Sequence, residues 1–195
     1  MDQAYWTMNP AYVESVWWAL SELHAKGLLY RGHKVVWWWA QGGTVLSAAE
    51  VGEGYKTVDD PSVYVRFPLE DEPDTSLLVW TTTPWTLSAN VAAAVNPKLE
   101  YAEVTSPEWD GTLVLAKSAI GVLGDIPKQV GRCFKGEELV GLAYETFFPD
   151  FEAQRAVEHR VVAWEDVDGK EGSGVVHIAP GCGREDYELG LKEGL

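Results

Sequence analysis

Residues 76–84 read Ser76-Leu-Leu-Val-Trp-Thr-Thr-Thr-Pro84, an apolar run followed by three threonines and a proline. The apolar part predicts a β-strand over 76–80, and Pro84, which has no amide hydrogen, ends the strand ladder soon afterwards. At a strand end, the threonine hydroxyls and backbone amides could hold a sugar, a water or a developing oxyanion. A threonine run is also common in a plain edge strand, so this stretch alone does not decide the function.

Short β-rich runs recur along the chain on both sides of this stretch, separated by turns marked with Pro and Gly. The predicted strands are 34–39, 62–67, 76–80, 99–104, 112–116, 160–164 and 174–178. Seven short strands predict a barrel or a sandwich, within a strand-rich α+β chain.

Three helices are predicted around these strands. The first begins at Asn9 and Pro10, a cap followed by a proline at the first helical position, and it stops near Gly27. A short helix is expected over 117–123 and a last one over about 185–192.

A second segment, Gly172-Ser-Gly-Val-Val-His-Ile-Ala-Pro-Gly-Cys-Gly-Arg-Glu-Asp186, combines polar groups with a strand end. The strand contains His177, and Asp186 falls in the first turn of the following helix. A helix N-terminus favours the charged carboxylate, which suits Asp186 to hold a cation such as an α-ammonium group. Simpler explanations remain open, because Asp186 could only compensate the helix dipole and His177 could be an ordinary core histidine.

Composition limits the classes of protein to consider. The chain has 195 residues, 46% of them apolar, and a formal net charge of −15, so its average field repels phosphate. No run approaches the ~20 apolar residues of a membrane span, and the N-terminus lacks signal-peptide features, so we expect a soluble cytoplasmic protein. Cys133 and Cys182 form no Cys-x-x-Cys pair, and we expect two buried or idle thiols.

The two segments together resemble the editing insertion of isoleucyl-tRNA synthetases, of the class I synthetase family. The resemblance rests on Trp80-Thr-Thr-Thr-Pro-Trp-Thr-Leu87 with Asn90-Val-Ala-Ala-Ala-Val-Asn-Pro97, and on residues 172–186. Valyl and leucyl relatives would carry an Arg-Pro pair after the threonines, whereas this chain reads Thr83-Pro84-Trp85. The similarity implies a small β-barrel editing domain over 34–195, preceded at 1–33 by a helix and linker of the parent synthetase.

The resemblance also implies an activity, which is hydrolysis of valine from mischarged tRNA(Ile). Asp186 would bind the α-ammonium group, and Thr81, Thr82 and Thr83 would hold the terminal adenosine and the attacking water. Four further residues would shape the side-chain pocket, namely Trp80, Thr86, Asn90 and His177. Among them, His177 would exclude isoleucine by its size. The expected partners are the acceptor end of tRNA(Ile) and the remainder of the synthetase in cis, and no cofactor is expected, since ATP and magnesium serve the parent enzyme.

One departure and three alternatives accompany this interpretation. Relatives carry a Cys-x-x-Cys zinc pair where this chain has Trp39 and Gly42, so we expect no structural zinc. The same fold could prefer another ester, such as threonine or norvaline. A non-catalytic RNA- or protein-binding module is the second alternative, which the acidic charge favours slightly, and an unrelated ligand-binding barrel is the third.

Overall fold

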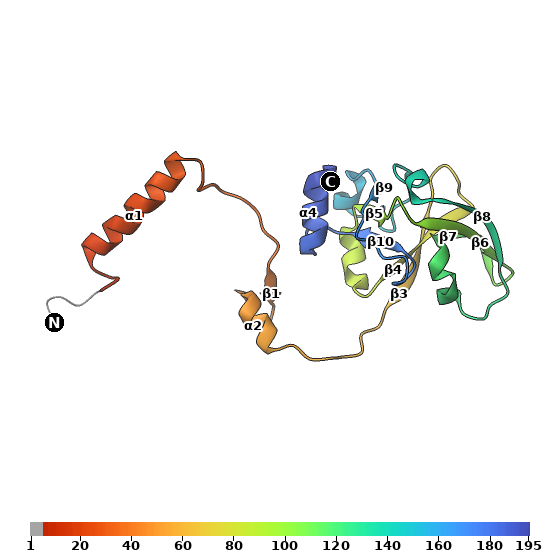
Figure 1. Cartoon of the computed structure of the whole chain (residues 1–195), viewed down its shortest axis with the longest axis horizontal. Helices are drawn as coiled ribbons and strands as arrows, with labels where there is room; N and C mark the ends of the chain where they lie inside the picture. Colours follow the sequence, from red (N-terminus) through yellow and green to blue (C-terminus); the bar gives the residue numbers. More distant parts are fainter. Residues whose placement is uncertain (1–5) are drawn as a thin grey trace. The chain divides into compact units, whose positions relative to one another are not determined.

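The computed structural model describes residues 6–195, which fall into two units. One unit ends at Lys34, and the other covers Val35–Leu195. Figure 1 shows the course of the chain through both. Among the described residues, none of the helices combines the length and apolar character that crossing a membrane requires.

The first unit contains the helix α1 (Pro10–Ala25), which confirms the predicted N-terminal helix. Asn9 caps it, because the side chain accepts a hydrogen bond from the amide of Ala11 at 3.0 Å. Gly27 follows the end of the helix with a φ of +69°, a conformation that glycine adopts without strain. No residue of α1 is buried within this unit.

A small hairpin opens the second unit. Strands β1 (Trp37–Trp39) and β2 (Thr44–Leu46) pair antiparallel and are followed by the helix α2 (Ala48–Glu53). The ring of Trp39 lies over Gly42, where an added Cβ would come within 2.1 Å of it. Strand β1 thus confirms the predicted strand 34–39 over its last three residues. Strand β2 and helix α2 were not predicted.

The remaining strands form one eight-stranded sheet in the order β8-β6-β7-β4-β10-β5-β9, with β3 on the other side of β4. Their bounds are β3 (Val63–Pro68), β4 (Thr75–Thr81), β5 (Ala92–Val95), β6 (Glu100–Ser106), β7 (Trp109–Ala116), β8 (Gln129–Lys135), β9 (Arg160–Ala163) and β10 (Val175–Ile178). All the strands predicted beyond residue 60 are confirmed, whereas β5 and β8 were not predicted.

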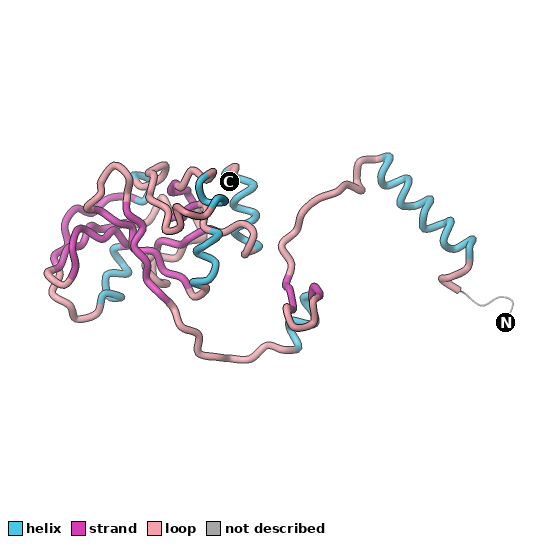
Figure 2. The backbone as a smooth tube through the Cα atoms, turned by 180° about the vertical axis from the view of Figure 1, so that it is seen from behind, coloured by secondary structure: helices cyan, strands magenta, loops and turns pink. Residues whose placement is uncertain are grey.

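The sheet curls and closes part of itself into a small barrel. Hydrogen-bonded neighbours run from β3 through β4, β10 and β5 to β9. Two isolated bridges complete the circuit, since Ala143 pairs with Arg160 of β9 and Tyr144 pairs with Leu69, directly after β3. Strands β7, β6 and β8 extend from β4 beyond this barrel, and Figure 2 shows the curled strands from behind. The expected barrel is thereby confirmed.

Short helices occupy the connections of this body. They are the 3-10 helices η1 (Pro84–Ala89), η2 (Lys117–Leu123) and η3 (Gly136–Glu138), and the α-helices α3 (Glu152–Arg155) and α4 (Arg184–Glu193). The predicted helices at 117–123 and 185–192 are confirmed as η2 and α4, while η1, η3 and α3 were not expected. Strand β4 ends at Thr81 and η1 begins at Pro84, so the strand stops shortly before the proline.

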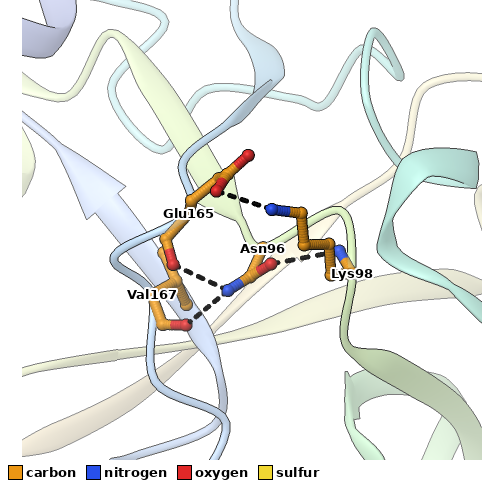
Figure 3. A network of polar contacts seen from close by, with 4 residues as sticks. All are labelled: Asn96, Lys98, Glu165 and Val167. Atoms are coloured by element: carbon orange, nitrogen blue, oxygen red, sulfur yellow. Dashed lines mark hydrogen bonds and ion pairs between the residues drawn. The ribbon is translucent and has the colours of Figure 1, made fainter.

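Hydrogen bonds of the buried Tyr101 hydroxyl join β6 to the start of β10. Tyr101 is fully buried, and its hydroxyl donates to the carbonyl of Gly174 at 2.8 Å while accepting from the amide of Asn96 at 3.1 Å. Burial raises the pKa of Tyr101 to about 12. The Asn96 side chain donates to the carbonyls of Glu165 (2.7 Å) and Val167 (3.2 Å), which holds the end of β5 to the segment after β9 (Figure 3).

Replacing Tyr101 by Phe should destabilise the protein. The substitution leaves the Asn96 amide and the Gly174 carbonyl without their partner, and such a loss costs about 1–3 kcal/mol. Urea unfolding of parent and variant measures the difference. Tyr64→Phe is the control, because that side chain is 43% exposed and its substitution should stay within about 0.5 kcal/mol. An equal loss of unfolding free energy in both variants would show that the Tyr101 hydrogen bonds are not a specific source of stability.

Candidate active site

The two polar segments meet at one edge of the sheet. Strands β4 and β10 run parallel, with Trp80 beside Val176, so the segments that follow the two strands leave the sheet at the same edge. A cleft of about 310 Å³ lies there. It is lined by Trp80, Thr81, Thr82, Thr83, Trp85, Thr86, Val176, His177, Cys182, Gly183 and Asp186.

The threonines after β4 are tied to one another. Thr81 is 5% exposed, and its Oγ1 accepts a hydrogen bond from the backbone amide of Thr83 at 3.0 Å. The Oγ1 atoms of Thr81 and Thr83 lie 3.3 Å apart, and both Thr82 and Thr83 are exposed. The turn therefore presents hydroxyls to the cleft from a backbone that is fixed by its own side chains.

The threonine chain continues to the histidine. The Thr86 hydroxyl donates to the carbonyl of Thr83 at 2.7 Å and lies 2.8 Å from Nε2 of His177. Since the Thr86 hydrogen is engaged with the carbonyl, we assign the proton of the imidazole to Nε2, which donates to Thr86 Oγ1. Nδ1 then carries a lone pair, and it is buried without a hydrogen-bond partner.

His177 is neutral at ordinary pH. Its side chain is only 6% exposed, and burial lowers its pKa to about 4. The imidazole therefore contributes shape and a directed hydrogen bond to the cleft, and no positive charge.

Asp186 lies in the first turn of α4, as predicted. Its Oδ2 accepts a hydrogen bond from the amide of Ala179 at 2.8 Å. Burial raises the pKa of this carboxyl above its usual value, against the lowering effect of the Ala179 bond, and the charge of Glu185 raises it further. The helix N-terminus, on which the prediction for Asp186 rested, favours the charged carboxylate, but here burial outweighs that effect.

Charge balance in the cleft favours a cation. Of the residues that line it, none is Lys or Arg, so Asp186 has no positively charged neighbour there. A bound cation would restore the ionised form of the carboxylate and would be held by it.

Asn90 lies apart from the other predicted site residues. It is 2% exposed, its side-chain amide donates to the carbonyl of Ala92 at 2.8 Å, and its Oδ1 accepts from the Tyr144 hydroxyl at 2.6 Å. Because both ends of the side chain are engaged inside the barrel and the residue does not line the cleft, its position gives no support to direct substrate contact.

Four lining residues were not singled out from the sequence, namely Trp85, Val176, Cys182 and Gly183. All lie within the two quoted segments, so their nearness to the predicted residues was the available indication. Of the two alternatives expected for the cysteines, buried or idle, burial is excluded, since both Cys133 and Cys182 are exposed. Cys182 follows a Pro-Gly turn, which keeps it outside the core.

Comparisons with known proteins support the family. The model for tRNA synthetases class I (I, L, M and V) matches residues 1–166. The isoleucine–tRNA ligases of Clostridium tetani and Methanothermobacter thermautotrophicus are 40% and 45% identical, over all of this chain and 18% of their own lengths. The chain thus spans under a fifth of the length of these curated relatives.

A solved structure supports the fold. The editing domain of the P. knowlesi cytosolic leucyl-tRNA synthetase matches 68% of this chain and 62% of its own, with a TM-score of 0.54 and 14% identity. The chain therefore belongs to the class I tRNA synthetases (I, L, M and V), matches a segment of isoleucine–tRNA ligases and has the fold of a synthetase editing domain.

Proposed function

We propose that this chain hydrolyses the ester of valine attached in error to tRNA(Ile). The observation that carries the proposal is the cleft itself, in which a carboxylate without a cationic neighbour shares a small space with the threonine hydroxyls. An aminoacyl ester presents the matching groups, because it joins an α-ammonium group to a ribose rich in hydrogen-bonding oxygens.

The names of the relatives supply the amino acid. Isoleucine and valine differ by one methylene, and a hydrophobic pocket separates such ligands by only ~1–3 kcal/mol, a limit for which isoleucyl-tRNA synthetases are the standard example. A second site that admits valine, excludes isoleucine and hydrolyses its occupant removes the remaining errors. The parent synthetase would attach isoleucine with ATP, and this domain would work in cis on the acceptor end.

The proposed roles follow the positions in the cleft. Asp186 binds the α-ammonium group, and Thr81, Thr82 and Thr83 hold the terminal adenosine and the attacking water. Trp80, Thr86 and His177 shape the side-chain pocket, which is supported by their common place on the cleft wall.

Hydrolysis at this site would proceed without a protein nucleophile. Water attacks the ester carbonyl, the tetrahedral intermediate loses its bond to the ribose oxygen, and that oxygen takes a proton as valine leaves. His177, with a pKa of about 4, is too weak a base to remove a proton efficiently near neutral pH. The chemistry therefore depends on positioning, on polar stabilisation of the intermediate and on the substrate's own ribose hydroxyl, and it requires no cofactor.

Release of labelled valine from Val-tRNA(Ile) tests the proposal, with Ile-tRNA(Ile) as the comparison substrate. Asp186→Asn should lower kcat/KM roughly 10- to 150-fold, because it removes a charge-assisted contact. The asparagine oxygen can still accept from Ala179, so the loss would report charge rather than a broken cap. Thr83→Ala should also lower the rate, whereas Thr105→Ala should not, because Thr105 is an exposed residue of β6 that does not line the cleft. If the parent protein released no valine, the hydrolytic function would be rejected and the non-catalytic binding module would be the remaining alternative.

The rate should depend on pH through Asp186. Since burial raises its pKa, the ionised form that binds the ammonium group is lost at a higher pH than for an exposed aspartate, whose pKa is ~3.9. The acid limb of the pH profile of log kcat/KM, which reports the free protein, should therefore lie above pH 3.9. The acid limb of the pH profile of kcat should lie at lower pH, because the bound cation favours the ionised carboxylate. Asp186→Asn should abolish this limb. A limb that persists unchanged in the variant would assign the titration to another group.

His177→Ala should relax the exclusion of isoleucine. Removing a buried imidazole from the cleft wall leaves room for one more methylene, so deacylation of Ile-tRNA(Ile) should rise about 10-fold or more relative to Val-tRNA(Ile). His159→Ala is the matched control, because His159 is also buried but does not line the cleft. If the variant still spared isoleucine, or if both variants relaxed equally, size exclusion by His177 would be rejected.

A further inference from the structure

Trp85 differs from the other tryptophans of the barrel body. Residues 63–195, all described, contain four tryptophans, and only Trp85 has a mostly exposed side chain, at 69%. Trp80, which lines the same cleft, is partly buried and packs on Gly172, where an added Cβ would come within 2.5 Å of its ring. The cleft therefore has one packed indole and one whose surface is open.

The backbone that follows Trp85 is held at two residues. The next residue, Thr86, bonds to the Thr83 carbonyl and to His177. Further along η1, the carbonyl of Ser88 accepts from the side chain of Gln154 at 3.1 Å. An aromatic ring on a fixed support loses little conformational freedom when a planar group covers it.

The charge of the chain limits what else could hold a nucleic acid here. The net charge is −15, and no Lys or Arg lines the cleft. Arg184, next to the lining residue Gly183, is paired with Glu188 at 3.0 Å. Phosphate contacts are therefore poor anchors at this site, while an exposed indole can bind a nucleobase through its uncharged face.

Resting on the proposed function, we propose that Trp85 is the stacking platform for the nucleobase of the 3′-terminal nucleotide. Stacking of the adenine on the indole would anchor the nucleoside, so that the ribose ester reaches the threonines and the ammonium group reaches Asp186. Trp85 is thus a binding residue, and it contributes to affinity only through its contact with the nucleobase.

Two non-hydrolysable probes separate the base from the rest of the substrate. The first is valine joined by an amide to 3′-amino-3′-deoxyadenosine, and the second is the same amide on a ribose methyl glycoside without a base. Calorimetry gives Kd for the parent chain, Trp85→Ala, Trp85→Phe and Trp38→Ala. The last is a matched control, because Trp38 is 62% exposed and does not line the cleft. Thermal unfolding verifies that each variant remains folded.

Trp85→Ala should weaken binding of the adenosine probe roughly 5- to 150-fold, the usual effect of removing one stacked aromatic ring. It should leave the base-free probe unchanged, and Trp85→Phe should lose less than Trp85→Ala. Asp186→Asn should instead weaken both probes. An equal loss for both probes in Trp85→Ala, or no loss for either, would overturn the stacking role while leaving the proposed function in place. Parent chain that bound neither probe and released no valine would overturn both.

Discussion

The parallel pairing of β10 with the end of β4 is the constraint on which the site depends. Trp80 lies beside Val176 in this register, and the two strands therefore deliver the threonine turn and the Pro-Gly turn to one edge. The bond between Thr86 and His177 joins residues 91 positions apart and exists only because of that pairing. A slip of one residue in β10 would turn His177 to the opposite face of the sheet and remove it from the cleft.

The start of β10 is held by contacts that leave no room for a side chain. Gly174 has a φ of +71°, and an added Cβ would lie 2.4 Å from Cβ of Ala116 on β7. The amide of Ala116 donates to Ser173 at 2.8 Å, and Tyr101 donates to Gly174. These bonds place the strand in the fork where β4 separates from β7, so the buried tyrosine and the glycine act together to fix the register of a site they do not touch.

Local patterns predicted those parts of the fold that local chemistry determines. Pro84 predicted that the strand would end soon after the threonines, Asn9 with Pro10 predicted α1, and short β-rich runs predicted most strands. Strand β5 was missed because Ala92-Ala-Ala-Val95 has little intrinsic β preference and is a strand by virtue of complete burial between β10 and β9. The raised pKa of Asp186 and the separation of Asn90 from the cleft were equally hidden, since both arise from neighbours brought by tertiary folding.

An acidic chain with a carboxylate in its cleft is an unusual surface for a polyanion, and the proposed reaction gives that charge a use. In the proposed reaction, the acceptor end carries one cation before hydrolysis, the α-ammonium group, and Asp186 would bind it in a cleft that no Lys or Arg lines. Hydrolysis separates the cation from the phosphate chain. The deacylated end then keeps only the charges that the protein repels, and the valine gains a carboxylate that Asp186 also repels. The same electrostatics that weaken general tRNA binding would thus favour the mischarged substrate over both of its products, because affinity rests on the one group that the reaction removes from the nucleic acid.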